Sequence, residues 1–150
     1  MIYYEDIEPG TFARFGAKRV ERDEVIAFAE QFDPQPFHLS DEAAAQTYFG
    51  RLSASGWHTC AMTMRMLVDQ MTQVRQAGLG SPGVESLRWL RPVYPGDTLR
   101  VETRVLDRRA SQSRPDMGSY RSEATVFNQD DVAVLTFVST ALIRRRPTGD

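Results

Sequence analysis

The feature that most constrains the fold is a single long helical stretch, from about Trp57 to Gln76, with apolar side chains on nearly every face of its first half. A helix that is apolar so far around its circumference is usually buried on most sides. Beyond Gln76 the chain carries only strand patterns, separated by turn residues. We therefore expect an α+β fold in which an antiparallel sheet wraps around this one helix.

The strand patterns differ in how they use their two faces. Residues Thr98 to Leu106 alternate between apolar and polar side chains, which predicts a half-buried strand. Residues Val132 to Ile143 are apolar on both faces and are expected in the interior of the sheet. The other expected strands are Thr11 to Val20, Val84 to Leu90 and Ser119 to Asn128, with loops at Ala77 to Gly83 and Ser111 to Gly118.

Two shorter helices are expected before the long one. Asp23 is placed to cap a helix from Glu24 to Phe32, and Ser40 to cap a helix from Asp41 to Tyr48. A single curved sheet over one helix would leave an edge strand and an apolar flank uncovered. We expect a second copy of the chain to cover both, as a homodimer.

Length and charge limit the classes of function. With 150 residues and 17.0 kDa, the chain is expected to form one domain over residues 1–150. A net charge of −2 argues against a surface dedicated to nucleic acid, which needs clustered Lys and Arg. The one basic run, Arg144 to Arg146, is expected to be a solvated tail, with a weak anion site as the alternative.

A cytoplasmic location is expected. Cys60 is the only cysteine, so no disulfide can form within the chain, which suits a reducing compartment. The first ten residues, MIYYEDIEPG, lack the basic and apolar regions of a signal peptide. No apolar run approaches the roughly 20 residues that a membrane-spanning helix needs, so no membrane partner is expected.

The segment FDPQPFHLSD places Asp33 and His38 around two prolines. Pro34 and Pro36 restrict the loop, so that little entropy is lost in holding both side chains at one point. A carboxylate beside an imidazole can bind water and transfer its proton near neutral pH. The alternative is a proline-rich turn in which Asp33 binds nearby backbone amides and His38 enters a helix. The spacing alone leaves both open.

Gly56 begins the long helix, where backbone amides point outward at the positive end of the helix dipole. A glycine there can let a ligand oxygen approach a bare N–H, as in an oxyanion hole; a glycine chosen for packing is the alternative. His58 is expected to be satisfied locally in the first turn. Cys60 and the methionines are expected in the core, and two histidines with one cysteine make no recognisable zinc pattern, so no metal is expected.

Taken together, these residues resemble a known family. The run Asp33 to His38, DPQPFH, resembles the D-x-N-P-x-H motif of the MaoC-like dehydratases, which include the (R)-specific enoyl-CoA hydratases. Gly56, 18 residues after His38, looks like the oxyanion glycine of that family. The run Arg91 to Leu99, RPVYPGDTL, is similar to the P-V-x-x-G-D-x-L segment, which is shared more widely among hot-dog proteins.

The resemblance implies a hot-dog fold, normally a homodimer, and an enzyme that hydrates a trans-2-enoyl-CoA or dehydrates a 3-hydroxyacyl-CoA. It implies that Asp33 and His38 bind the reacting water, and that the Gly56 N–H polarises the thioester carbonyl. No metal or redox cofactor is implied, since CoA is part of the acyl-CoA substrate.

The chain departs from the family motif in ways that affect the substrate site. Gln35 replaces the usual Asn, and Pro34 stiffens a normally free position. Met64 stands where some relatives carry a Ser, and the sequence does not decide whether Thr59 or Thr63 replaces it. Substrate contacts are expected from Gln35, Trp57, Arg88 and Arg91, with Arg51 a further candidate for the CoA phosphates.

Two other functions remain open on the sequence. The hot-dog fold also hosts acyl-CoA thioesterases, although these usually lack an Asp–His pair before the central helix. A non-catalytic subunit that binds acyl-CoA or an acyl carrier is the other alternative.

Overall fold

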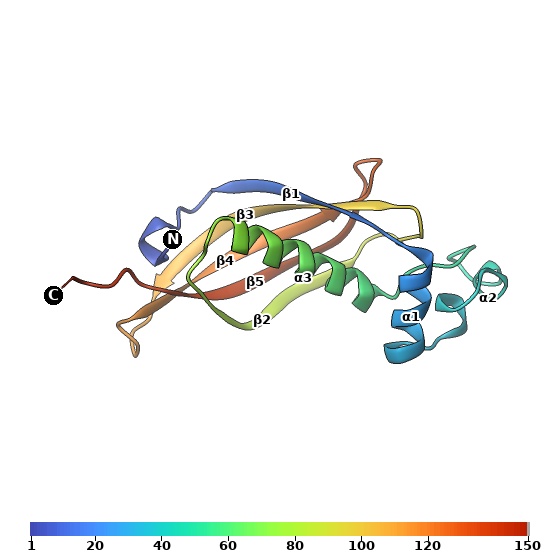
Figure 1. The fold of residues 1–150 in the computed structure, drawn as a ribbon, viewed down its shortest axis with the longest axis horizontal. Helices are drawn as coiled ribbons and strands as arrows, with labels where there is room; N and C mark the ends of the chain where they lie inside the picture. The colour runs from blue at the N-terminus through green and yellow to red at the C-terminus, as the bar shows by residue number, and fades with distance from the viewer. Residues whose placement is uncertain (150) are drawn as a thin grey trace.

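A computed structural model describes residues 1–149 and shows one curved antiparallel sheet wrapped around one long helix, so the expected α+β architecture is confirmed (Figure 1). Helix α3 lies across the concave face of the sheet, and helices α1 and α2 lie at the end where α3 begins. The elements are η1 (Tyr4–Asp6), β1 (Phe12–Arg19), α1 (Arg22–Phe32), η2 (Pro36–His38), α2 (Asp41–Ala45), α3 (Gly56–Gln73), β2 (Gly78–Trp89), β3 (Thr98–Ala110), β4 (Met117–Phe127) and β5 (Ala133–Arg144).

The sheet has the strand order β1-β3-β4-β5-β2, and every neighbouring pair is antiparallel. Strand β5 lies between β4 and β2 and buries Val134, Leu135 and Phe137, which confirms the interior position expected from its two apolar faces. Strand β2 is at one edge, and its residues are exposed along almost its whole length. Its ladder with β5 contains three shifts of register.

Helix α3 is buried on only part of its surface. Met62 and Met66 pack in the main core with Leu99, Val101 and other strand residues. The opposite face leaves Trp57 and Met64 about half exposed and Val68 partly so, so burial on most sides was too strong an expectation. The apolar surplus of α3 is therefore open to a partner. Within residues 1–149, no helix is both long enough and apolar enough to cross a membrane.

Several boundaries differ from those expected. The segment from residue 77 to 83 is not a loop, because β2 begins at Gly78 and Gly83 pairs with Thr140 of β5. Pairing along the sheet edge holds these glycines in the ladder despite their turn-like composition. Helix α1 begins at Arg22, so its N-cap position is Glu21 rather than Asp23 and no side chain caps it; α2 ends at Ala45. Ser40 caps α2 as expected, by accepting a hydrogen bond from Ala43 N.

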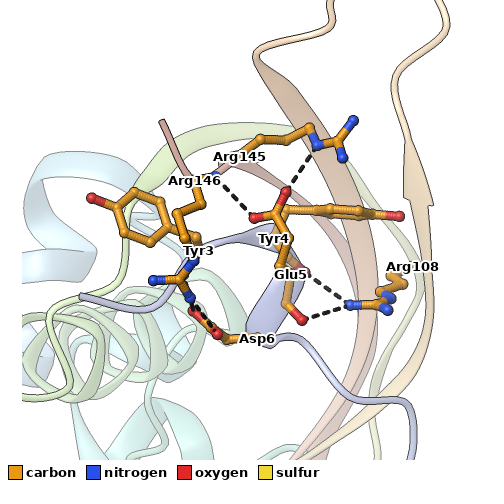
Figure 2. A network of polar contacts seen from close by, with 7 residues as sticks. All are labelled: Tyr3, Tyr4, Glu5, Asp6, Arg108, Arg145 and Arg146. Carbon is orange, nitrogen blue, oxygen red and sulfur yellow. Dashed lines mark hydrogen bonds and ion pairs between the residues drawn. The ribbon is translucent and has the colours of Figure 1, made fainter. Parts of the chain in front are cut away.

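The basic run is not a solvated tail (Figure 2). Arg145 Nε donates to Glu5 at 2.9 Å, and the Arg146 guanidinium binds both oxygens of Asp6. The hydrogen bonds from Arg145 and from the backbone of Arg146 lower the pKa of Glu5 to about 2. These contacts clasp the N-terminal η1 to the end of β5, at the pole of the molecule away from α1 and α2.

Candidate active site

The loop that carries Asp33 and His38 is held by its own backbone. Asp33 ends α1, with its N–H donating to Ala29 O at 2.9 Å. Gln35 N then donates to Asp33 O at 2.8 Å, and His38 N donates to Gln35 O at 2.9 Å. Pro36 opens the η2 turn, where its fixed φ suits the first helical position and its missing N–H costs nothing. The chain therefore folds back within five residues.

This turn brings the two side chains together. His38 Nε2 lies 3.5 Å from Asp33 Oδ2. Gln35 Nε2 donates to the other carboxylate oxygen, Asp33 Oδ1, at 2.7 Å. One carboxylate oxygen is thus held by Gln35 and the other faces the imidazole. His38 is buried, and the Asp33 side chain keeps 16% of its surface exposed, so the pair can be reached from solvent.

The contact on the far side of the imidazole fixes its tautomer. His38 Nδ1 lies 2.7 Å from the carbonyl oxygen of Ser53. A carbonyl can only accept, so Nδ1 must carry the proton, and in the neutral ring Nε2 then presents a lone pair. Nε2 and Asp33 Oδ2 are consequently two acceptors facing each other. A water molecule between them could donate one hydrogen to each, which is the arrangement that activates water for addition.

The surroundings of Asp33 act on its pKa in opposite directions. Burial raises the pKa of Asp33, while hydrogen bonding to the neighbouring Ser55 hydroxyl and the Gln35 amide lowers it, and the net shift is downward. The carboxyl group is therefore ionised at neutral pH and acts as an acceptor.

Gly56 is the first residue of α3, and the segment that leads to it lies against the dyad through the Ser53 carbonyl. The Gly56 N–H donates to no atom of residues 1–149, as is usual for the first amides of a helix. A Cβ built on Gly56 would lie 2.5 Å from the Trp89 indole. Glycine is therefore required here for packing against Trp89.

The expected substrate-binding residues are dispersed around this helix start. Trp57 is mostly exposed and meets Trp89 edge-on, with ring centroids 5.1 Å apart. Arg88 and Arg91 are exposed on either side of Trp89, and the Arg91 guanidinium donates to Leu90 O. Gln35 contacts Asp33 rather than projecting freely. The guanidinium of Arg51 lies over the Tyr94 ring, 3.8 Å from its centroid.

The second histidine, His58, lacks the local hydrogen bond to its Nδ1 that the sequence led us to expect. His58 is buried and stacks on Phe28, with centroids 4.7 Å apart, and its Nδ1 has no hydrogen-bond partner among residues 1–149. Burial lowers the pKa of His58, and nearby Glu24 and Lys18 act in opposite directions. His58 is therefore neutral in the folded protein and packs as an aromatic ring.

Acid should destabilise the fold through His58. The unfolded chain binds a proton that the buried ring excludes, so the free energy of unfolding should fall as the pH drops through about 6.5, the ordinary pKa of histidine in an unfolded chain. His58→Phe keeps the stacked ring and removes the titration, and should show a smaller loss over the same range. Urea unfolding at several pH values measures both slopes; parallel slopes would contradict this account.

Sequence reasoning missed three polar contributions to the site. Ser53 supplies the carbonyl that orients His38, and Ser55 places a fully buried hydroxyl beside Asp33. Asp41 accepts from Leu52 N at 2.9 Å and also pairs with Arg22, so it ties the segment before α3 to α1 and α2. The serine-rich run before Gly56 was the available signal, but its partners are distant in the sequence.

The candidate site is open in the single chain. A cavity of about 250 Å³ lies elsewhere, between β1 and the C-terminal half of α3, and is lined by residues such as Gly16, Lys18, Arg65 and Asp69. Within the described residues, no three His, Cys, Asp or Glu side chains are grouped to hold a metal ion.

Residues 8–126 match the family described as the MaoC like domain. The chain is also 31% identical over 109 residues to a 3-hydroxybutyryl-CoA dehydratase from Methylorubrum extorquens, a match that covers 71% of this chain and 66% of that protein.

Among solved structures, a MaoC-like dehydratase from Rhodospirillum rubrum superposes with a TM-score of 0.89 at 41% identity, covering 99% of this chain and 100% of that one. A Mycobacterium tuberculosis protein with a double hot-dog fold superposes with a TM-score of 0.82 at 21% identity, covering 99% of this chain and 46% of that one. The sheet wrapped around α3 is therefore the hot-dog fold that the sequence motifs implied.

Proposed function

Because the chain belongs to the MaoC-like domain family, we propose that it adds water to a trans-2-enoyl-CoA thioester, or removes water from the corresponding 3-hydroxyacyl-CoA. The observation that carries this proposal is the facing pair of acceptors, His38 Nε2 and Asp33 Oδ2, at 3.5 Å. The name of the 31% identical relative, a 3-hydroxybutyryl-CoA dehydratase, supports a CoA thioester as the substrate class.

In the proposed reaction, a water molecule is held by two hydrogen bonds, one donated to His38 Nε2 and one to Asp33. The water oxygen adds to C3 of the enoyl group while the dyad takes one proton, and a proton is then delivered to C2. Negative charge collects on the thioester oxygen in between, and the free Gly56 N–H at the start of α3 would stabilise it. Addition of water changes no oxidation state overall, so the reaction requires no redox cofactor, and we propose that it requires no metal.

We also propose that two copies of the chain form the working unit. Strand β2 leaves one edge of the sheet unpaired, and β2 and α3 carry exposed apolar residues, among which Trp57 of α3 contacts Trp89 of β2: Trp57, Met64, Val84 and Trp89. A second copy would pair the edge and cover these side chains. Light scattering coupled to gel filtration should give twice the mass of the chain; a monomer at micromolar concentration would reject the dimer.

A panel of enoyl-CoA thioesters tests the proposed activity. Crotonyl-, hexenoyl-, octenoyl-, branched and dicarboxylic enoyl-CoAs should be offered separately, and hydration should appear as loss of the enoyl absorbance with no release of free thiol. EDTA should leave the rate unchanged. Release of thiol from saturated acyl-CoA would instead indicate a thioesterase. Binding of enoyl-CoA without turnover across the panel would indicate a non-catalytic subunit.

A further inference from the structure

Ser55 is a buried polar residue whose side chain the proposed reaction does not use. It is the last residue before α3 and has no solvent-exposed surface. Its hydroxyl makes no hydrogen bond of ordinary geometry with any atom of residues 1–149. Buried hydroxyl groups are nearly always paired, so an unpaired one calls for a specific explanation.

The usual role of a serine at this position is not the explanation. A serine before a helix normally accepts a hydrogen bond from an amide of the first turn. Ser40 does this for α2 in the same chain, by accepting from Ala43 N at 3.2 Å. Ser55 makes no such bond to α3, although its residue type suits the role. Its hydroxyl is therefore free to serve another group, and the first amides of α3 are left free as well.

The neighbour of that hydroxyl is the Asp33 carboxylate. The segment from Ser53 to Gly56 passes along the dyad, with the Ser53 carbonyl oxygen 2.7 Å from His38 Nδ1. Ser55 itself has an extended backbone, with φ −52° and ψ 139°, and stands two residues beyond Ser53. The Ser53 hydroxyl lies 3.5 Å from His38 Nδ1. Ser55, one step further along, lies beside Asp33 and opposes the rise that burial produces in the pKa of Asp33.

We propose that Ser55 is a positioning residue for Asp33, to which its hydroxyl donates a hydrogen bond in the hydrated site, in the free protein as well as in the substrate complex. This inference rests on the proposed function for its catalytic consequence. Gln35 already holds Oδ1 of Asp33 at 2.7 Å. A second donor, from the segment before α3, would keep the carboxylate ionised and hold it toward the imidazole. The hydroxyl acts through Asp33 and does not itself touch the reacting atoms.

The test is the titration of Asp33 itself, followed by carboxyl-carbon NMR in the free protein. Ser55→Ala should move the Asp33 titration to higher pH. Gln35→Ala, which removes a donor already in place, should move it in the same direction and serves as the positive control. Asp107, held by Arg121 on the outer surface of the sheet, should titrate unchanged and serves as the internal reference. An Asp33 titration identical in Ser55→Ala and wild type would overturn the proposal.

Kinetics add a second readout. In Ser55→Ala the acid limb of the kcat/KM profile should move to higher pH, with a loss of about tenfold on that limb and a smaller loss at pH 8. Ser55→Thr, which keeps the hydroxyl, should restore the wild-type limb. A uniform loss at all pH values would instead assign Ser55 a merely structural role.

The test remains decisive if Ser55→Ala does not fold, and also if the wild type has no hydratase activity. Should Ser55→Ala fail to fold, Ser55→Cys keeps the shape with a weaker donor, and a raised Asp33 titration in that variant supports the proposal while an unchanged one rejects it. Should the wild type show no hydratase activity, the titration still reports on Ser55 and Asp33. Failure of the proposed function is thereby separated from failure of this inference.

Discussion

Asp33→Asn should fold like the wild type and lower kcat/KM for hydration of the best enoyl-CoA by about 10²–10⁴-fold, because an amide cannot take a proton from water. His38→Ala should cause a loss of similar size. It removes the lone pair that faces Asp33 Oδ2 across 3.5 Å. Both rates would be measured by loss of enoyl absorbance, with circular dichroism to verify folding.

The two residues should also act as one unit. If a single water is held between them, the double variant should lose little more activity than either single variant, because the first substitution already destroys the arrangement. Asp116→Asn is a suitable control, since Asp116 lies on an exposed loop and pairs with Arg114. Turnover close to the wild-type rate in either dyad variant would reject the mechanism.

The second large effect is expected at Gly56. In Gly56→Ala the new methyl group would overlap the Trp89 indole, whose nearest atoms are 2.5 Å from its position. We expect destabilisation of about 1–3 kcal/mol from overpacking. Displacement of the ring or of the helix start should also weaken the contact between the amide and the thioester oxygen, with a loss of about 10²–10³ in kcat.

A double variant separates these two effects. Trp89→Leu makes room for the methyl group, so Gly56→Ala combined with Trp89→Leu should regain stability relative to Gly56→Ala alone. Activity should remain low if the bare amide is needed. Recovery of both stability and activity in the double variant would mean that Gly56 matters only for packing. Gly78→Ala is the matched control, because no atom lies within 4 Å of its added methyl group, and it should behave as the wild type. Thermal unfolding and initial rates provide the two measurements.

The sequence predicted the architecture well because the strongest signals were local. The apolar stretch that became α3 and the two-faced apolar pattern of β5 both depend on periodicity within one element. The start of β2 was missed because its glycines and Pro82 resemble a loop, and only pairing with β5 holds them extended. The exposed face of α3 was missed because the apolar pattern does not show which side the sheet covers.

The candidate site was predicted in part for the same reason. Asp33 and His38 stand close in the sequence, so their convergence depended on one short turn. The roles of Ser53 and Ser55 depend on contacts across 15 or more residues, for which the chain offers no periodic signal. The environments of His58 and Arg146 could not be predicted for the same reason. His58 stacks on Phe28 of α1, and Arg146 pairs with Asp6 of η1, and both partners are distant in the sequence.

The irregular ladder between β2 and β5 has a consequence for the proposed pairing of two copies of the chain. An exposed edge that ran straight would accept any passing strand, and successive chains could add to it without end. Here Gly80, Gly83 and Ser86 have positive φ angles and the register shifts three times, so the edge is corrugated. Only a strand whose backbone N–H and C=O groups follow the same irregular spacing can pair along the whole edge. The shape of this border thus favours a closed, finite particle over an open-ended fibre.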